Sequence, residues 1–157
     1  MTRDPIKESR AHCEHAFAFL CHEYGCKQRA RYLPSGYELY YWNATTALRL
    51  VYFLRDPLFE YIGPRPEGPF PPGREEYGAR TRTEWFELLD IVEVVTSRRP
   101  TFDDDVRYAI PSMALVEQYA DWTRQHCDGL LHGDFAMLGE VRRRLKTRTQ
   151  TTNQFPR

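Results

Sequence analysis

The centre of the chain contains the stretch that decides the fold, YELYYWNATTALRLVYFL at residues 37–54. Its first six residues, 37–42, are mostly aromatic and favour an extended strand. Residues 48–54 place leucine or tyrosine at every second position, with arginine among the residues between them. The polar segment 43–46, Asn-Ala-Thr-Thr, separates the two runs and has the composition of a turn. Together these features predict an antiparallel β-hairpin.

Further strands are expected on both sides of this hairpin. Residues 58–62 follow an Asp56-Pro57 turn signal and form a third predicted strand, while residues 28–33 are a candidate edge strand. Residues 63–73 contain five prolines and three glycines, which predicts an irregular loop. The expected sheet is therefore antiparallel, with three or four strands.

Helices are predicted at both ends of the chain. A narrow apolar stripe at helical spacing runs through residues 6–24, and Gly25 follows where a left-handed cap is expected. After the proline-rich loop, apolar residues at helical spacing predict three more helices, at about residues 84–95, 112–131 and 134–145.

These elements predict the α+β fold class. An N-terminal helix is followed by the antiparallel sheet, and three C-terminal helices pack on that sheet. The length of 157 residues suits one hydrophobic core, so we expect a single domain over residues 1–146. Residues 147–157 are polar and are predicted to form a disordered tail.

Charge is balanced overall but unevenly distributed along the chain. With 22 basic and 22 acidic residues, a nucleic-acid binder is not expected, since phosphate contacts need a surplus of Lys and Arg. Residues 84–117 hold eight acids against three bases, a net charge of −5, whereas residues 134–157 hold six bases against two acids, a net charge of +4. We interpret the basic run Arg142–Arg144 as a solvated helix face.

The sequence also bears on the compartment. No stretch approaches the roughly 18–20 apolar residues of a membrane span, and the N-terminus lacks the apolar region of a signal peptide. A cytoplasmic protein without membrane contact is therefore expected, and its four cysteines are expected to be reduced thiols.

One short motif suggests catalysis. His132-Gly133-Asp134 resembles the catalytic segment of aminoglycoside-phosphotransferase-like kinases, in which such an aspartate accepts the substrate hydroxyl proton. That pattern requires a metal-binding asparagine five residues after the aspartate, where this chain has Gly139. No glycine-rich phosphate loop precedes the motif, and only 23 residues follow Asp134. We therefore interpret Gly133 as a helix end and Asp134 as the N-cap of the next helix.

Cysteine and histidine residues give no recognisable site either. The N-terminal helix carries residue types that bind zinc, but only His22 and Cys26, across the helix end, have a ligand-like spacing. His126 and Cys127 are neighbours, which point about 100° apart on a helix and cannot form a nucleophile–base contact. We predict no catalytic residue, no metal site and no cofactor.

The helix predicted at residues 84–95 carries an acidic edge. Glu87, Asp90 and Glu93 are spaced by three, so they line one side of the helix away from its apolar arc. Phe86 and Val94 are expected on the same outer side, where acidic and apolar residues together suit contact with a basic protein. An ordinary solvated helix face is the alternative.

The arrangement as a whole resembles the immunity proteins of bacterial polymorphic toxin systems. The residues behind this resemblance are Phe17-x-Phe19-Leu20 with Tyr24-Gly25, the hairpin of residues 37–54, Tyr119-Ala120-Asp121-Trp122, and Leu130 to Phe135. The resemblance implies an intracellular domain that binds and neutralises a cognate toxin by stoichiometric protein–protein contact. It carries over no binding residue, because toxin-facing surfaces differ between these proteins.

A toxin that acts on nucleic acid would have a basic active-site surface, which an acidic inhibitor complements. The predicted contact residues combine the acidic edge, an acidic loop and strand aromatics: Glu87, Asp90, Glu93, Asp103, Asp104, Asp105, Tyr40 and Trp42. Two alternatives remain open. One is a small enzyme or ligand-binding domain with a pocket between sheet and helices, and the other is an adaptor or structural subunit.

Overall fold

The computed structural model describes residues 3–53, 58–68, 70–71, 84–102 and 113–153, with the backbone alone for residues 149–153. Its elements, in chain order, are α1 (Pro5–Ala16), α2 (Phe19–Tyr24), β1 (Lys27–Leu33), β2 (Gly36–Trp42), β3 (Thr46–Phe53), β4 (Phe59–Pro64), β5 (Phe86–Glu87), α3 (Leu88–Thr96), α5 (Met113–His126), α6 (Asp128–Leu131) and α7 (Leu138–Asn153). The predicted α+β class is confirmed.

The strands form one antiparallel sheet in the order β1-β2-β3-β4-β5. The predicted hairpin is its centre, with Tyr37 opposite Tyr52 and Tyr41 opposite Leu48. Asn43 closes the turn, because its side-chain oxygen accepts hydrogen bonds from the backbone N–H groups of Thr45 and Thr46. The sheet has five strands rather than three or four, since β5 occupies residues that were predicted to be helical.

Two predicted helices are each divided in two. The N-terminal helix breaks after α1, which places Phe17, Phe19 and Leu20 all in the core. One continuous helix could not do this, because residues two apart point about 200° apart. Gly25 ends α2 in the expected left-handed conformation, with φ +65°. The helix predicted at 112–131 likewise divides into α5 and α6 around the buried Cys127.

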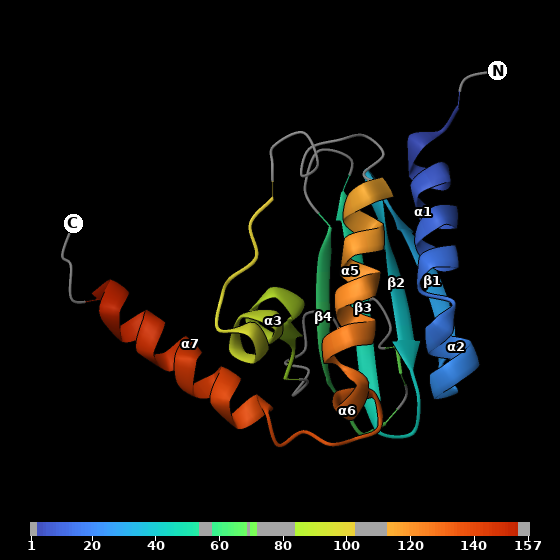
Figure 1. Ribbon diagram of the computed structural model, residues 1–157. Coiled ribbons are helices and arrows are strands. Elements are labelled where there is room, and N and C mark those ends of the chain that lie inside the picture. Colours follow the sequence, from blue (N-terminus) through green and yellow to red (C-terminus); the bar gives the residue numbers. More distant parts are fainter. Residues whose placement is uncertain (1–2, 54–57, 69, 72–83, 103–112, 154–157) are drawn as a thin grey trace.

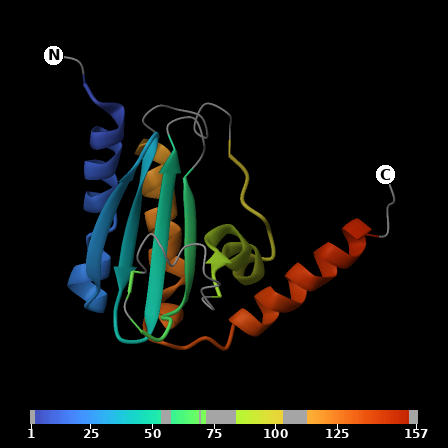
Figure 2. The same cartoon turned by 180° about the vertical axis from the view of Figure 1, so that it is seen from behind.

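The helices α1 and α5 cover one face of the sheet, as the two opposite views show (Figure 1 and Figure 2). The covered face supplies most of the core, because every second residue of the central strands is buried against the helices. On the opposite face, Phe70 packs on Tyr40 and Trp42 at ring-centroid distances of 5.6 and 5.4 Å, and Trp85 joins this second cluster.

Helix α7 extends away from the rest of the molecule (Figure 1). Leu138 and Val141, in its first turns, are buried. The helix continues to Asn153, beyond the domain boundary predicted at residue 146. The apolar residues that anchor it end at Leu145, so apolar burial alone does not hold the later turns. Residues 154–157 of the predicted tail lie outside the described residues.

Candidate partner-binding surface

A cavity of about 360 Å³ opens at the sheet edge beside α3. Residues from four places in the fold meet here: the start of β4, the β5–α3 junction, the segment after α3, and α5. The lining consists of Leu58, Phe59, Glu87, Leu89, Arg99, Pro100, Thr101, Phe102 and Tyr119. We call this site the α3-edge cavity.

The backbone explains why these residues converge. Strand β5 pairs with β4 through Tyr61 opposite Glu87, which fixes Glu87 at the sheet edge immediately before α3 begins. Ser97 ends α3 in the left-handed conformation, with φ 61°, and the chain reverses there. The reversal carries residues 99–102 back along the helix and places them on the cavity wall.

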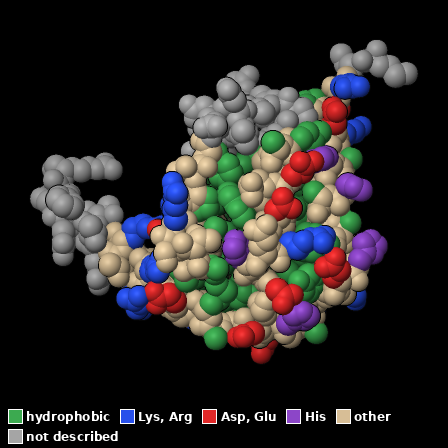
Figure 3. All heavy atoms as spheres, in the orientation of Figure 1, with side chains coloured by type: hydrophobic (Ala, Val, Ile, Leu, Met, Phe, Trp, Pro, Cys, Tyr) green, Lys and Arg blue, Asp and Glu red, His purple; other side chains and the backbone are tan. Residues whose placement is uncertain are grey.

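Aromatic rings form much of the apolar wall. Phe102 stacks on Tyr119 with ring centroids 6.1 Å apart and planes 8° apart, and Trp122 lies 5.4 Å from Phe102. Tyr119 is buried, whereas Phe59 and Phe102 are half-buried and partly reach solvent. In the space-filling view an apolar patch is visible between α5 and the segment after α3 (Figure 3).

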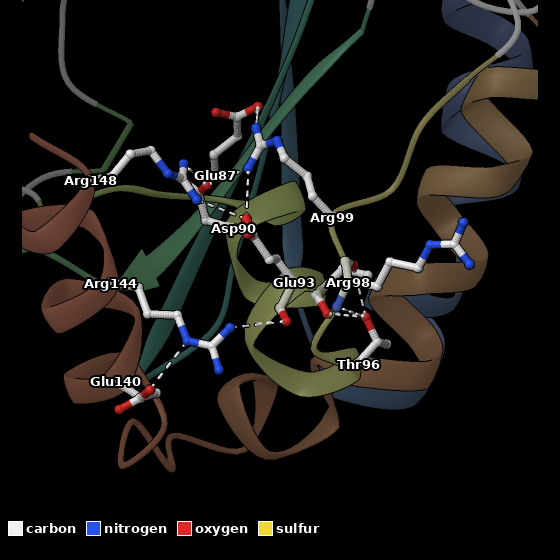
Figure 4. Close-up of polar contacts among 10 residues, drawn as sticks. Glu87, Asp90, Glu93, Thr96, Arg98, Arg99, Glu140, Arg144 and Arg148 are labelled. Atoms are coloured by element: carbon white, nitrogen blue, oxygen red, sulfur yellow. Dashed lines mark hydrogen bonds and ion pairs between the residues drawn. The ribbon is translucent and has the colours of Figure 1, made fainter. Parts of the chain in front are cut away.

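The acidic edge of α3 lies beside this cavity and is paired within the molecule (Figure 4). Arg99 donates from Nη1 to Asp90 Oδ1 at 2.7 Å and to Glu93 Oε2 at 3.2 Å. Arg148 of α7 reaches the same two carboxylates, at 3.2 Å from Asp90 and 2.8 Å from Glu93. The acidic middle and the basic end of the sequence therefore meet in one ion-pair network.

Most of the other basic residues of α7 are engaged as well. Arg142 binds Glu84 with two hydrogen bonds of 2.6 and 2.7 Å, and Arg143 pairs with Glu140. Arg144 contacts Glu140 and the backbone oxygen of Glu93. The gathering of Lys and Arg over α7 in Figure 3 is thus largely matched by neighbouring carboxylates.

Glu87 is the least compensated carboxylate of this group. Its nearest cation is Arg99, whose Nη2 lies 4.0 Å from Glu87 Oε1 while Nη1 is bound to Asp90 and Glu93. Burial raises the pKa of Glu87 above its ordinary value, and the neighbouring Asp90 raises it further, against the opposing effect of Arg99 and Arg148. An additional cation near Glu87 would therefore be favourable.

The residues predicted to contact a partner fall into three groups. Glu87, Asp90 and Glu93 lie together on β5 and α3, and only Glu87 lines the cavity. Asp90 is buried with 8% of its surface exposed, so Arg99 and Arg148 cover much of the predicted acidic edge. Phe86, expected on the outer side, is in the core because its partner in the sheet is Ile62.

The other predicted contact residues do not join this site. Tyr40 is buried on β2, and the half-buried Trp42 packs with it against Phe70, three strands away from β5. Asp103, Asp104 and Asp105 lie outside the described residues.

Sequence reasoning missed the remaining wall of the cavity. Arg99 follows the acidic helix closely, and its charge was the one available signal. Phe59 lies in the strand predicted at residues 58–62, Tyr119 lies in the helix predicted at residues 112–131, and Phe102 lies between the predicted helices. Nothing in their local patterns indicates that they meet.

The residues considered for catalysis have structural roles. Gly133 has φ +88°, as expected just after a helix end. The prediction that Asp134 caps the next helix is wrong, because α7 begins only at Leu138; the Asp134 side chain instead accepts a hydrogen bond from the backbone N–H of Ala136 at 3.1 Å, in the turn before the helix. All four cysteines are free thiols, and burial raises the pKa of the Cys13 and Cys127 thiols, which disfavours the thiolate. Among the described residues, no group of three or more His, Cys, Asp or Glu side chains is placed to hold a metal ion.

A second cavity, of about 400 Å³, lies between the end of α2, the β2–β3 turn and α6. It is more open to solvent than the α3-edge cavity. The Tyr24 hydroxyl at its rim donates to Asp128 at 2.6 Å, and Asn43 donates to the backbone oxygens of Tyr24 and Leu131. These bonds tie the β2–β3 turn to the helices.

No described helix has the length and apolar character needed to cross a membrane. Comparison of the chain with protein-family models, with curated proteins and with solved structures finds no match.

Proposed function

We propose that this protein is a binding protein that neutralises a cognate bacterial toxin by stoichiometric protein–protein contact. The observation that carries the proposal is the α3-edge cavity, in which an under-compensated carboxylate lies beside partly exposed aromatic rings. Protein interfaces concentrate their binding energy in a few anchor side chains that enter such pockets.

The charge at this surface supports a basic partner. The three carboxylates of Glu87, Asp90 and Glu93 meet the two guanidinium groups of Arg99 and Arg148, which leaves one negative charge in excess. Asp90 and Glu93 each form ion pairs with both arginines. We therefore assign these two carboxylates a structural role at the surface. Glu87 is the acidic group that remains for a partner.

A ligand-binding domain is the second candidate, and the cavity volume favours it. The volume lies at the lower end of the range of about 300–1,000 Å³ that is common for small-molecule sites. Among the described residues, the lining contains no histidine or cysteine, and Glu87 is its one carboxylate. The same aromatic and acidic residues suit a protein anchor.

Co-expression with the product of the adjacent gene tests the proposal. We expect a complex of one copy each in size-exclusion chromatography, together with protection of cells that express the toxin. Charge reversal by Glu87→Lys is expected to weaken the complex about tenfold or more, because the new lysine would repel the basic surface of the partner. The matched control is Glu23→Lys, an exposed site beside the second cavity.

Absence of both binding and protection with any adjacent gene product would contradict the proposal. Equal loss of binding in the Glu23 and Glu87 variants would place the contact elsewhere.

A further inference from the structure

We infer that the α3-edge cavity receives a cationic side chain of the partner, an arginine or a lysine, with Glu87 as its counter-ion and the rings of Phe59 and Phe102 against its stem. The inference rests on the proposed function and names the chemistry of the residue that the toxin inserts. It is carried by three features of the cavity: its unused negative charge, its aromatic wall and the position of its arginine.

The carboxylate of Glu87 provides the charge. No hydrogen bond is made to it by any of the described residues, and its one close cation is 4.0 Å away. A half-buried carboxylate in this state is partly desolvated without full compensation. A guanidinium or ammonium group brought to it from outside would form the charge-assisted hydrogen bonds that are missing.

The walls fit the rest of such a side chain. Leu58, Leu89 and Phe59 are apolar and suit the methylene stem of arginine or lysine. Aromatic faces attract cations, and this protein already uses that contact within the fold, with Arg124 4.4 Å above the ring of Phe19.

Anionic occupants fit less well. Among the described residues of the wall, Arg99 is the one cation, and Asp90 and Glu93 already bind it through Nη1. A phosphate or carboxylate would have to compete with these two carboxylates and would face Glu87 across the cavity. The arrangement therefore selects for positive charge.

A capped amino acid provides a direct test that needs no knowledge of the toxin. The probe is N-acetyl-arginine methylamide, titrated into the full chain and followed by amide chemical shifts. The neutral control is the citrulline analogue, which keeps the shape of arginine and removes its charge. We expect saturable shifts at Glu87, Leu89 and Phe102, with the citrulline compound about tenfold weaker.

Two variants localise the effect. Glu87→Gln keeps the volume of the side chain and is expected to weaken the arginine probe about tenfold, whereas Glu84→Gln, three residues away and outside the lining, is expected to leave it unchanged. Circular dichroism and a thermal melt check that both variants fold. Equal binding of citrulline and arginine, no saturable shift, or indifference to Glu87→Gln would each overturn the inference.

The two proposals fail in different ways. If a toxin complex forms and Glu87→Gln leaves it intact, the cationic anchor is wrong and the binding function stands. If the arginine probe binds and no adjacent toxin does, the cavity assignment stands and the proposed function is wrong.

Discussion

Two glutamates are buried on opposite faces of the same sheet, and their surroundings differ completely. Glu38, 2% exposed, lies on the outer face between Arg31 and Arg49, each of which pairs with one carboxylate oxygen. Glu60, fully buried, lies on the helix-covered face, where its side chain accepts a hydrogen bond from the hydroxyl of Thr123. Within the described part of the chain, Glu38 is bound by two cations and Glu60 by none.

Burial and the contact with Thr123 have opposite effects on the protonation of Glu60. The Thr123 hydroxyl contacts both Glu60 and the backbone oxygen of Tyr119, which lies 2.9 Å away. The hydroxyl of Thr123 has one hydrogen, which it shares between Glu60 Oε2 and the backbone oxygen of Tyr119. Burial raises the pKa of Glu60 to about 8, against the lowering effect of the hydrogen bond from Thr123, so the protonated form is favoured at neutral pH.

The two faces of the sheet differ in whether the groups around a buried carboxyl group can stay hydrated. Arg31 and Arg49 keep 24% and 23% of their side chains exposed, so their charged groups remain partly hydrated while they neutralise Glu38. Helices cover the other face, where burial raises the pKa of Glu60, and Glu60 in turn helps to raise the pKa of the Cys13 and Cys127 thiols. A buried carboxyl group is therefore bound by two arginines on the outer face, whereas on the inner face burial favours its protonated form.

The largest expected effect comes from removing Glu38, the member of this pair that two arginines bind. Glu38→Ala takes away the carboxylate that separates two like charges, Arg31 and Arg49, and should lower the free energy of unfolding by about 3 kcal/mol. Urea titration at neutral pH measures it. A loss below about 1 kcal/mol would mean that solvent and other contacts satisfy both arginines without Glu38.

The second prediction concerns pH. In the unfolded chain Glu60 ionises near its ordinary pKa of about 4.3, while in the folded protein it keeps its proton up to about pH 8. The unfolded state therefore binds fewer protons between these values, so this group's contribution to stability falls as the pH rises through that window. Glu60→Gln should remove this contribution, which is on the order of a few kcal/mol.

The measurement is the free energy of unfolding at about pH 5 and about pH 8 for wild type and variant. The free energy of unfolding of the variant should rise relative to that of the wild type as the pH increases. Glu23→Gln, an exposed substitution, is the control and should follow the wild type. Parallel pH profiles for Glu60→Gln and wild type would show that Glu60 is ionised in the fold.

The smallest effect on stability is expected in the ion-pair network between α3 and α7, which is more exposed to solvent than Glu38 and Glu60. Arg148→Gln breaks contacts with Asp90 and Glu93, but Arg148 is 46% exposed and Arg99 still holds both carboxylates. The loss in unfolding free energy should be below about 1 kcal/mol and should shrink at high salt. A loss as large as that of Glu38→Ala, independent of salt, would contradict this ranking.

Much of the fold could be predicted because its signals are local. The aromatic run of residues 37–42, the turn at Asn43 and the alternation after it predict the hairpin that forms the centre of the sheet. The cap at Gly25 follows from the conformational freedom of glycine. Strand β5 was missed because it has only two residues, and its strand character comes from pairing with β4.

The candidate site could be predicted only in part. The spacing of Glu87, Asp90 and Glu93 indicates one helix edge, since helical periodicity is a property of the sequence itself. Which of the three carboxylates remains available to a partner depends on Arg99 and Arg148. Arg148 belongs to α7 and lies more than fifty residues away in the chain. Asp90 is buried where these two arginines contact it, and its burial too depends on the tertiary structure.

The sequence by itself determined the order of helices and strands, the hairpin and the separation of acidic and basic segments, because each depends on residues close together in the chain. Tertiary structure alone decided that the two charged segments pair with each other, that Glu87 lines a cavity with distant aromatic residues, and that Glu38 is bound by two arginines whereas Glu60 is bound by the hydroxyl of Thr123. These outcomes depend on which groups share a low-dielectric environment, and only packing brings such groups together.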